Sequence, residues 1–164
     1  MTALALIVLI LATQISNVNK ETAIASEHYK SGSLLTKDEV KLLKDIPSIV
    51  PAGDVIAGNP WTGTPLVYAF SHREPLVNYM FHELPEYDII GQHLQDALTD
   101  PAVCAYANAH RIHWVLDFGN QEVYIGHHVY KGYANLENSK VVTLVKQEGD
   151  AKLYRITACD TQGS

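Results

Sequence analysis

The apolar positions of the chain fall into short runs separated by segments with helical spacing. Short apolar runs bounded by glycine, proline and polar residues are typical of strands. The predicted strands span residues 54–57, 75–79, 111–119, 140–147 and 151–159. Apolar residues three and four positions apart are typical of helices. The predicted helices span residues 36–46, 66–70, 88–100 and 101–110.

Two of these helices carry more detailed signals. Thr36 with Glu39 three positions later forms a capping-box pattern, and Pro47 is predicted to end the helix. In the helix predicted at residues 88–100, one face is apolar and is expected to point inward. Its residues are Ile89, Ile90, Leu94, Ala97 and Leu98.

After the first helix, the predicted order is β-α-β-α-α-β followed by a β-hairpin that turns at residues 148–150. Alternation of short apolar strands with helices indicates a parallel sheet with right-handed crossovers. The predicted fold class is therefore α/β: a small three-layer domain whose short parallel sheet is extended by the C-terminal hairpin.

The N-terminus begins with a strongly apolar segment, residues 3–12, and no charge precedes Lys20. A bilayer core of about 30 Å needs about 20 helical residues, so this segment is about half a span. It fits the end of a transmembrane helix or an atypical export signal or anchor, and a buried helix or strand is the alternative. We expect residues 1–13 to be the membrane segment, 14–33 a linker and 34–164 the α/β domain.

The net charge bears on the class of partner, and the cysteines bear on the cellular compartment. The 164 residues carry a net charge of -6 with no block of Lys and Arg, which argues against a nucleic-acid partner. The two cysteines, Cys104 and Cys159, form no C-x-x-C motif. In an exported chain they could form one disulfide, whereas in the cytosol they would more often be buried thiols.

The loop at residues 59–64 is the first candidate site. It follows a predicted parallel strand, where ligands collect in α/β sheets. Its polar and aromatic residues could bind an anion or a sugar, with the indole stacking on the sugar. They are Asn59, Trp61, Thr62 and Thr64. The loop lacks the lysine and glycine spacing of phosphate-binding motifs, and helix capping alone accounts for these residue types. We therefore favour the capping interpretation.

A second candidate group follows the next two predicted strands. Tyr79 is the last residue of the predicted strand 75–79, His82 and Glu83 follow it, and Asp117 lies near the end of residues 111–119. An Asp–His pair can bind a metal or transfer protons. No nucleophile stands at a recognisable strand-to-helix turn, so these residues are interpreted as polar groups at the rim of the sheet.

The remaining histidines form no metal motif. His110 and His113 straddle the end of a predicted helix, and His127 is adjacent to His128. Neighbouring side chains in a strand point to opposite faces, and neither pair matches H-E-x-x-H. We expect no catalytic residue, no metal centre and no cofactor in this chain.

Three segments resemble a known family. They are VIAGNPWTGTPLVYAFSHREP at residues 55–75, DPAVCAYANAHRIHWVLDFG at 100–119 and EGDAKLYRITAC at 148–159. Together they resemble the extracytoplasmic C-terminal domain of actinobacterial-type polytopic membrane proteins that are similar to GT-C type glycosyltransferases. The resemblance covers residues 36–160, without a match for the loop at 119–139.

This resemblance implies a domain outside the cytoplasm in which Cys104 pairs with Cys159. In that class the sugar-transfer chemistry, which uses a lipid-phosphate-linked sugar, belongs to acidic residues in loops between membrane spans. The expected function is therefore a non-catalytic accessory domain at the cell membrane that contacts a glycan, a partner or the rest of a membrane glycosyltransferase.

Two other functions stay open. One is a stand-alone ligand-binding protein or small enzyme that uses Asn59, Trp61, His82 and Asp117. The other is a cytosolic α/β domain whose N-terminal apolar segment belongs to the core.

Overall fold

The computed structural model describes residues 34–79, 85–123 and 128–160. The chain divides into units 1–34 and 35–164, and every element described below belongs to the second. The expected membrane segment and the linker, residues 1–13 and 14–33, lie outside the described residues. No helix in the described part of the chain has the length and apolar character needed to span a membrane.

The core of the fold is a five-stranded sheet with the strand order β2-β1-β3-β5-β4. Strands β1 (Val55–Gly58), β2 (Glu74–Pro75) and β3 (Ile112–Asp117) are parallel. Strand β5 (Ala151–Ile156) pairs antiparallel with β3, and β4 (Val142–Glu148) pairs antiparallel with β5. The predicted fold class, a short parallel sheet extended by a C-terminal hairpin, is confirmed.

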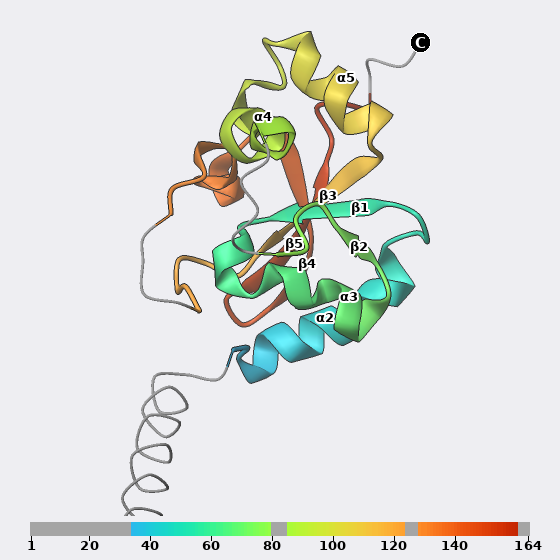
Figure 1. The fold of residues 1–164 in the computed structure, drawn as a ribbon, viewed down its shortest axis with the longest axis vertical. Coiled ribbons are helices and arrows are strands. Elements are labelled where there is room, and N and C mark those ends of the chain that lie inside the picture. Colours follow the sequence, from blue (N-terminus) through green and yellow to red (C-terminus); the bar gives the residue numbers. More distant parts are fainter. Residues whose placement is uncertain (1–33, 80–84, 124–127, 161–164) are drawn as a thin grey trace, which may run out of the picture. The chain divides into compact units, whose positions relative to one another are not determined.

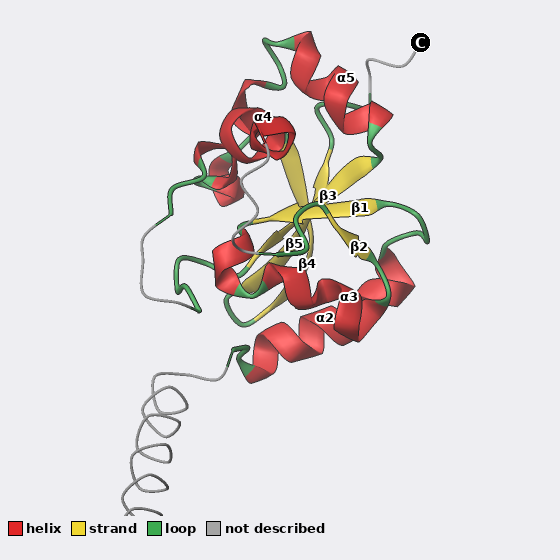
Figure 2. Ribbon diagram, viewed as in Figure 1, coloured by secondary structure: helices red, strands yellow, loops and turns green. Residues whose placement is uncertain are grey.

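Helices cover both faces of this sheet (Figures 1 and 2). Helices α2 (Lys37–Ile49) and α3 (Val67–Ser71) pack on one face, and α4 (Pro85–His93) and α5 (Pro101–Ala109) pack on the other. Short 3₁₀ helices lie in the connections. They are η1 (Pro60–Thr62), η2 (Thr64–Leu66), η3 (Leu94–Asp96), η4 (Lys131–Tyr133) and η5 (Leu136–Asn138).

Helix α2 begins as the pattern predicts. The backbone N–H of Thr36 donates to the Glu39 carboxylate at 2.6 Å, and the Glu39 N–H donates to the Thr36 hydroxyl at 3.2 Å. The two side chains thereby satisfy N–H groups that the first turn of a helix leaves unpaired. Its buried apolar face consists of Leu42, Leu43 and Ile46.

The end of α2 differs from the prediction, because the helix continues through Pro47 to Ile49. Pro47 lies in the last turn, and the Val50 N–H still donates to the Ile46 carbonyl at 2.8 Å beyond it. The Arg73 guanidinium donates to the Pro47 carbonyl at 3.0 Å and to the Val50 carbonyl at 2.8 Å. A residue 26 positions away therefore satisfies carbonyls that a helix end leaves free.

The predicted strand at residues 75–79 is wrong in extent, because β2 consists only of Glu74–Pro75. The Leu76 N–H donates to the Ile56 carbonyl at 2.8 Å, and the chain then leaves the sheet. Tyr79 is 58% exposed. An edge strand has a partner on one side only, so its apolar residues need not extend the pairing.

The helix predicted at residues 88–100 is wrong in its second half. An α-helix ends at His93 and continues as the 3₁₀ turn η3. A 3₁₀ helix has about 3.0 residues per turn instead of 3.6, so later side chains rotate away from the original face. Leu98 is accordingly 56% exposed. Ile90, Leu94 and Ala97 are buried.

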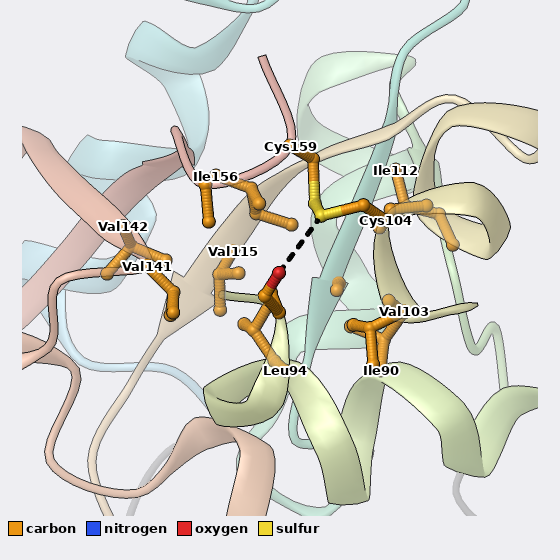
Figure 3. Packing of buried hydrophobic residues seen from close by; sticks show 14 of the residues in the cluster. Ile90, Leu94, Val103, Cys104, Ile112, Val115, Val141, Val142, Ile156 and Cys159 are labelled. Atoms are coloured by element: carbon orange, nitrogen blue, oxygen red, sulfur yellow. Dashed lines mark hydrogen bonds between the residues drawn. A yellow bond between two sulfur atoms is a disulfide. The ribbon is translucent and has the colours of Figure 1, made fainter. Parts of the chain in front are cut away.

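A disulfide joins Cys104 in α5 to Cys159, which follows β5 and lies 55 positions away. Both residues are buried among apolar side chains from α4, α5, β3 and β5, as Figure 3 shows. The dashed line in that figure marks a 3.6 Å contact between Cys104 Sγ and the Ala97 carbonyl. We treat it as a contact, because a disulfide sulfur carries no hydrogen. The pairing that the resemblance implies is present.

Candidate functional site

The carboxyl ends of β1 and β3 form a crevice. These strands are adjacent and parallel, but the chain leaves them in opposite directions. From β1 it continues through α3 to β2 at one edge, and from β3 it continues to the β4–β5 hairpin on the other side. In open α/β sheets, such a switch in direction separates the two loops and creates the usual ligand-binding position.

A cavity of about 250 Å³ occupies this crevice. Asn59 and Thr62 line it from the loop after β1, and residues 116–120 line it from the end of β3. The third wall consists of residues 128–130, 133 and 134. The loop after β1 and two parts of the segment that follows β3 therefore enclose one space.

The loop after β1 is a tightly bonded turn. The Trp61 N–H donates to Asn59 Oδ1 at 3.0 Å, and the hydroxyls of Thr62 and Thr64 donate to the Asn59 carbonyl at 2.9 and 2.8 Å. Gly63 has φ +88°, a backbone conformation that favours glycine. This bonding agrees with the capping interpretation, although Asn59 and Thr62 also line the cavity.

The end of β3 contributes a carboxylate. Asp117 Oδ1 accepts a hydrogen bond from the Gly119 N–H at 2.8 Å. Its cross-strand partner is Lys152, whose ammonium lies 2.9 Å from the Glu137 carboxylate. The bond to Glu137 is the main reason that the pKa of Lys152 is raised, and the charge of Asp117 adds to it.

The third wall is held against α4 and η3. The Gln95 side-chain amide donates to the carbonyls of Gly132 and Ala134 at 3.2 and 3.0 Å, and Gln92 donates to the Val129 carbonyl at 3.3 Å. A Cβ on Gly132 would lie 2.2 Å from the Ile90 carbonyl oxygen, so only glycine allows this approach.

This packing places two tyrosines at the cavity. The rings of Tyr130 and Tyr133 stack on each other with their centroids 5.8 Å apart, and both residues line the cavity. Gly91 in α4 makes room for them, since a Cβ there would lie 2.7 Å from Tyr130 Cδ1.

His128 lies between Trp61 and Glu122. Its imidazole stacks on the indole of Trp61 with centroids 3.6 Å apart and an angle of 2° between the ring planes. Glu122 Oε2 lies 2.9 Å from His128 Nδ1, and Oε1 accepts the His128 backbone N–H. The Glu122 side chain is only 5% exposed. The carboxylate and the indole thus hold the imidazole at the cavity wall.

The structure brings only part of the predicted site together. Asn59, Thr62 and Asp117 line the cavity, and Trp61 lies behind His128. Thr64 is buried in the turn, and Tyr79 is exposed beyond β2; neither lines the cavity. Three residues considered from the sequence lie outside the described residues: His82, Glu83 and His127.

His110 and His113, which the sequence placed around a helix end, have separate contacts. His113 Nδ1 lies 3.4 Å from Asp54 Oδ1, and His110 packs on the ring of Tyr106 with centroids 4.3 Å apart. Within the described ranges, no three His, Cys, Asp or Glu side chains gather in a way that could hold a metal ion.

Sequence reasoning missed the residues that the long loop contributes, namely Glu122, His128, Tyr130 and Tyr133. The loop has no hydrophobic periodicity, so its position could not be predicted. Its density of tyrosine and histidine was the available signal, because binding residues are common on loops that a rigid scaffold positions.

One buried polar group lies on the same side of the sheet. The Tyr154 side chain is 2% exposed, and its hydroxyl has no hydrogen-bond partner in the described part of the chain. Burial is the main cause of its raised pKa; the nearby charge of Lys152 acts in the opposite direction.

The structure is a mixed α/β domain with a cavity at the carboxyl ends of two of its parallel strands. The chain belongs to a family described as a family of unknown function (DUF6541), whose model matches residues 1–158. No curated protein matches the chain.

Among solved structures, the chain is similar to the C-terminal globular domain of an oligosaccharyltransferase from Archaeoglobus fulgidus. The identity is 11% and the TM-score 0.48, and the match covers 74% of this chain and 98% of that domain. A likeness of this size carries no argument about function.

Proposed function

We propose that residues 34–164 form a non-catalytic extracytoplasmic domain of a membrane protein related to lipid-linked-sugar glycosyltransferases. The disulfide between Cys104 and Cys159 carries this proposal. Disulfides form and persist in exported proteins and are rare in the cytosol of mesophiles. The bond joins two segments of the hydrophobic core, so it belongs to the folded domain.

Two features of the sequence support the same function. The apolar residues 3–12 suit the end of a membrane span that would attach the domain to the outer face of the membrane. The segments at 55–75, 100–119 and 148–159 resemble the C-terminal domains of such membrane proteins. The catalytic carboxylates of that class belong to loops between spans, so the proposed role of this domain is to contact glycan or the catalytic body.

The test is the redox state and location of the full chain in cells. Whole cells, and in parallel cells lysed in denaturant, are treated with a membrane-impermeant maleimide polymer before and after reduction, and the membrane fraction is washed with alkaline carbonate. We expect both thiols to be protected until reduction and the chain to remain in the membrane fraction. A Cys104→Ala variant serves as the control, because its single remaining thiol should react without reduction once the protein is unfolded.

The opposite result is equally clear. An intact chain in the cytosol with two reactive thiols would overturn the proposal and favour a cytosolic α/β domain.

The cavity supports a second candidate, a stand-alone ligand-binding protein. Its sequence-predicted residues Asn59 and Asp117 both line the cavity, and Trp61 supports it through His128. Such a protein would bind its ligand but would not need the membrane, so release of the chain by the carbonate wash separates the two candidates.

A further inference from the structure

We propose that the cavity between β1 and β3 binds a single sugar ring, as a neutral polyhydroxylated ligand at the end of a glycan. This inference deepens the proposed function and rests on it for the source of the ligand, a glycan outside the cytoplasm. The binding chemistry itself rests on the residues that line the cavity.

The size of the cavity limits the ligand. Small-molecule sites commonly range from about 300 to 1,000 Å³, and this cavity of about 250 Å³ lies just below that range. One pyranose or furanose ring is of suitable size, whereas a nucleotide-sugar is too large. At Gly119 an added Cβ would meet nothing within 4 Å, so the space continues outward there. A glycan could therefore extend from the bound ring.

The polar groups of the cavity suit hydroxyls. A sugar hydroxyl donates one hydrogen bond and accepts others, so it needs both kinds of partner. Asp117 offers a carboxylate of which one oxygen bonds the Gly119 N–H. The side-chain NH₂ groups of Asn59 and Asn120 donate to no other described residue. A carboxylate and two amides thus present acceptors and donors to one small space.

The aromatic residues suit the apolar side of a sugar ring. Tyr130 and Tyr133 line one wall, and the imidazole of His128 lies beside them. Aromatic rings offer a large apolar surface with little conformational freedom to lose, which suits the C–H groups of a pyranose. The stack on Trp61 and the contact with Glu122 hold His128 in place before a ligand arrives. A preorganised wall reduces the free-energy cost of binding.

The charge of the cavity excludes an anion. No Lys or Arg is among the described residues that line it, and Asp117 contributes a negative charge. The nearby Lys152 ammonium is paired with Glu137. Phosphate groups are usually bound by Arg, Lys or free backbone N–H groups, so the structure favours a neutral ring over a sugar phosphate.

Saturation-transfer NMR on the full 164-residue chain in detergent micelles tests the proposal. The probes are the methyl glycosides of glucose, mannose, galactose and arabinose, with inorganic phosphate and tetramethylammonium as competitors. We expect transfer to the ring protons of at least one glycoside, with a dissociation constant in the millimolar range, and no effect of either competitor.

Two pairs of variants locate the binding. Ala134→Phe fills the cavity from an exposed position, and Ala105→Phe places the same side chain on the exposed face of α5. Asp117→Asn keeps an oxygen for the Gly119 N–H but removes the charge, and Asp150→Asn is the matched change in the hairpin turn. We expect Ala134→Phe to abolish transfer and Asp117→Asn to weaken binding about tenfold. The two matched variants should bind as the wild type does.

Three results would overturn the inference: no transfer to any of the four glycosides, equal binding by Ala134→Phe, or displacement of the sugar by tetramethylammonium. Thermal unfolding of each variant shows whether it is folded, and Asp117→Asn decides the question if Ala134→Phe is not. These outcomes differ from failure of the proposed function. A membrane-bound, disulfide-bonded chain that binds no sugar overturns only this inference, whereas a reduced cytosolic chain overturns the proposed function whatever it binds.

Discussion

The two faces of the sheet are built differently. On the face covered by α2 and α3, the core is apolar and includes Leu42, Leu43 and Ile46. On the face covered by α4 and α5, the core contains the disulfide and the buried Tyr154 hydroxyl, and the loop that encloses the cavity packs there. The first face combines the apolar face of α2 with buried side chains from β1, β3 and β5. The second face depends on contacts between distant segments. It also carries the disulfide, the buried Tyr154 hydroxyl and the loop that encloses the cavity.

The largest effect is expected from removing the disulfide. The double variant Cys104→Ala/Cys159→Ala should lose about 4 kcal/mol of unfolding free energy, because the bond closes a loop of 55 positions and so limits the unfolded chain. Urea denaturation under non-reducing conditions measures the change. Hydrogen exchange should show that α5 loses protection before α2 does. Equal loss of hydrogen-exchange protection in α5 and α2 would contradict the difference between the two faces of the sheet.

A glycine substitution tests the loop that encloses the cavity. Gly132→Ala should cost about 2 to 3 kcal/mol, because the new Cβ would lie 2.2 Å from the Ile90 carbonyl oxygen and push the loop away from α4. The same change at Gly119 meets no atom within 4 Å and should cost about 1 kcal/mol, owing only to its φ of +75°. Denaturation of both variants measures the difference. Equal costs would show that the close approach to α4 is unimportant.

On the face covered by α2 and α3, the bonds from Arg73 to the end of α2 can be tested by substitution. Arg73→Met should lose about 1 to 2 kcal/mol, because the carbonyls of Pro47 and Val50 would lose charged donors. Arg73→Lys should recover part of the loss, since one ammonium can reach one of the two carbonyls. Circular dichroism and urea denaturation check this, and no change in Arg73→Met would mean that α2 ends without help from outside.

The smallest effect at neutral pH is expected at Tyr154. Tyr154→Phe should change stability by less than about 1 kcal/mol at pH 7, because the hydroxyl has no hydrogen-bond partner in the described part of the chain. The pKa of Tyr154 is raised by burial, so the folded state holds the phenol proton more tightly than the unfolded chain does. The contribution of the protonated Tyr154 phenol to the free energy of unfolding is complete below a pH of about 10. It is lost as the pH rises through the pKa of Tyr154 in the folded state.

The comparison between wild type and Tyr154→Phe removes this group together with its effect on Lys152, whose pKa is raised mainly by the bond to Glu137 and also by the charge of Tyr154. Lys152 and Glu137 are present in both proteins. Thermal unfolding between pH 8 and pH 11 should therefore show a smaller alkaline loss in the variant. Parallel curves would mean that Tyr154 titrates at its ordinary pKa.

Much of the fold was predictable because its signals are local. Thr36 and Glu39 lie one helical turn apart, and short apolar runs between helices indicate parallel strands. The errors occur where a distant residue decides the outcome. Helix α2 continues through Pro47, where Arg73 donates to the carbonyls of Pro47 and Val50, and the short strand β2 lies at an edge of the sheet. Leu98 is exposed because the helix tightens to 3₁₀ at Leu94.

The residues of the candidate site at the strand ends were predictable, and those of the long loop were not. Asn59 follows β1 and Asp117 is the last residue of β3, so the rule for the ends of parallel strands identifies them from position alone. His128, Tyr130 and Tyr133 lie in a loop without periodicity, and their place depends on contacts of Gly132 and Gln95 with other segments.

The sequence by itself determined the α/β class, the order of strands and helices, and the residues at the ends of β1 and β3, because these depend on neighbours within a few positions. Only the tertiary structure decided that the long loop returns to those strand ends and encloses a cavity with them. It also decided that Cys104 and Cys159 meet. Both outcomes depend on packing between segments far apart in the chain, and no local pattern of residues encodes such distances.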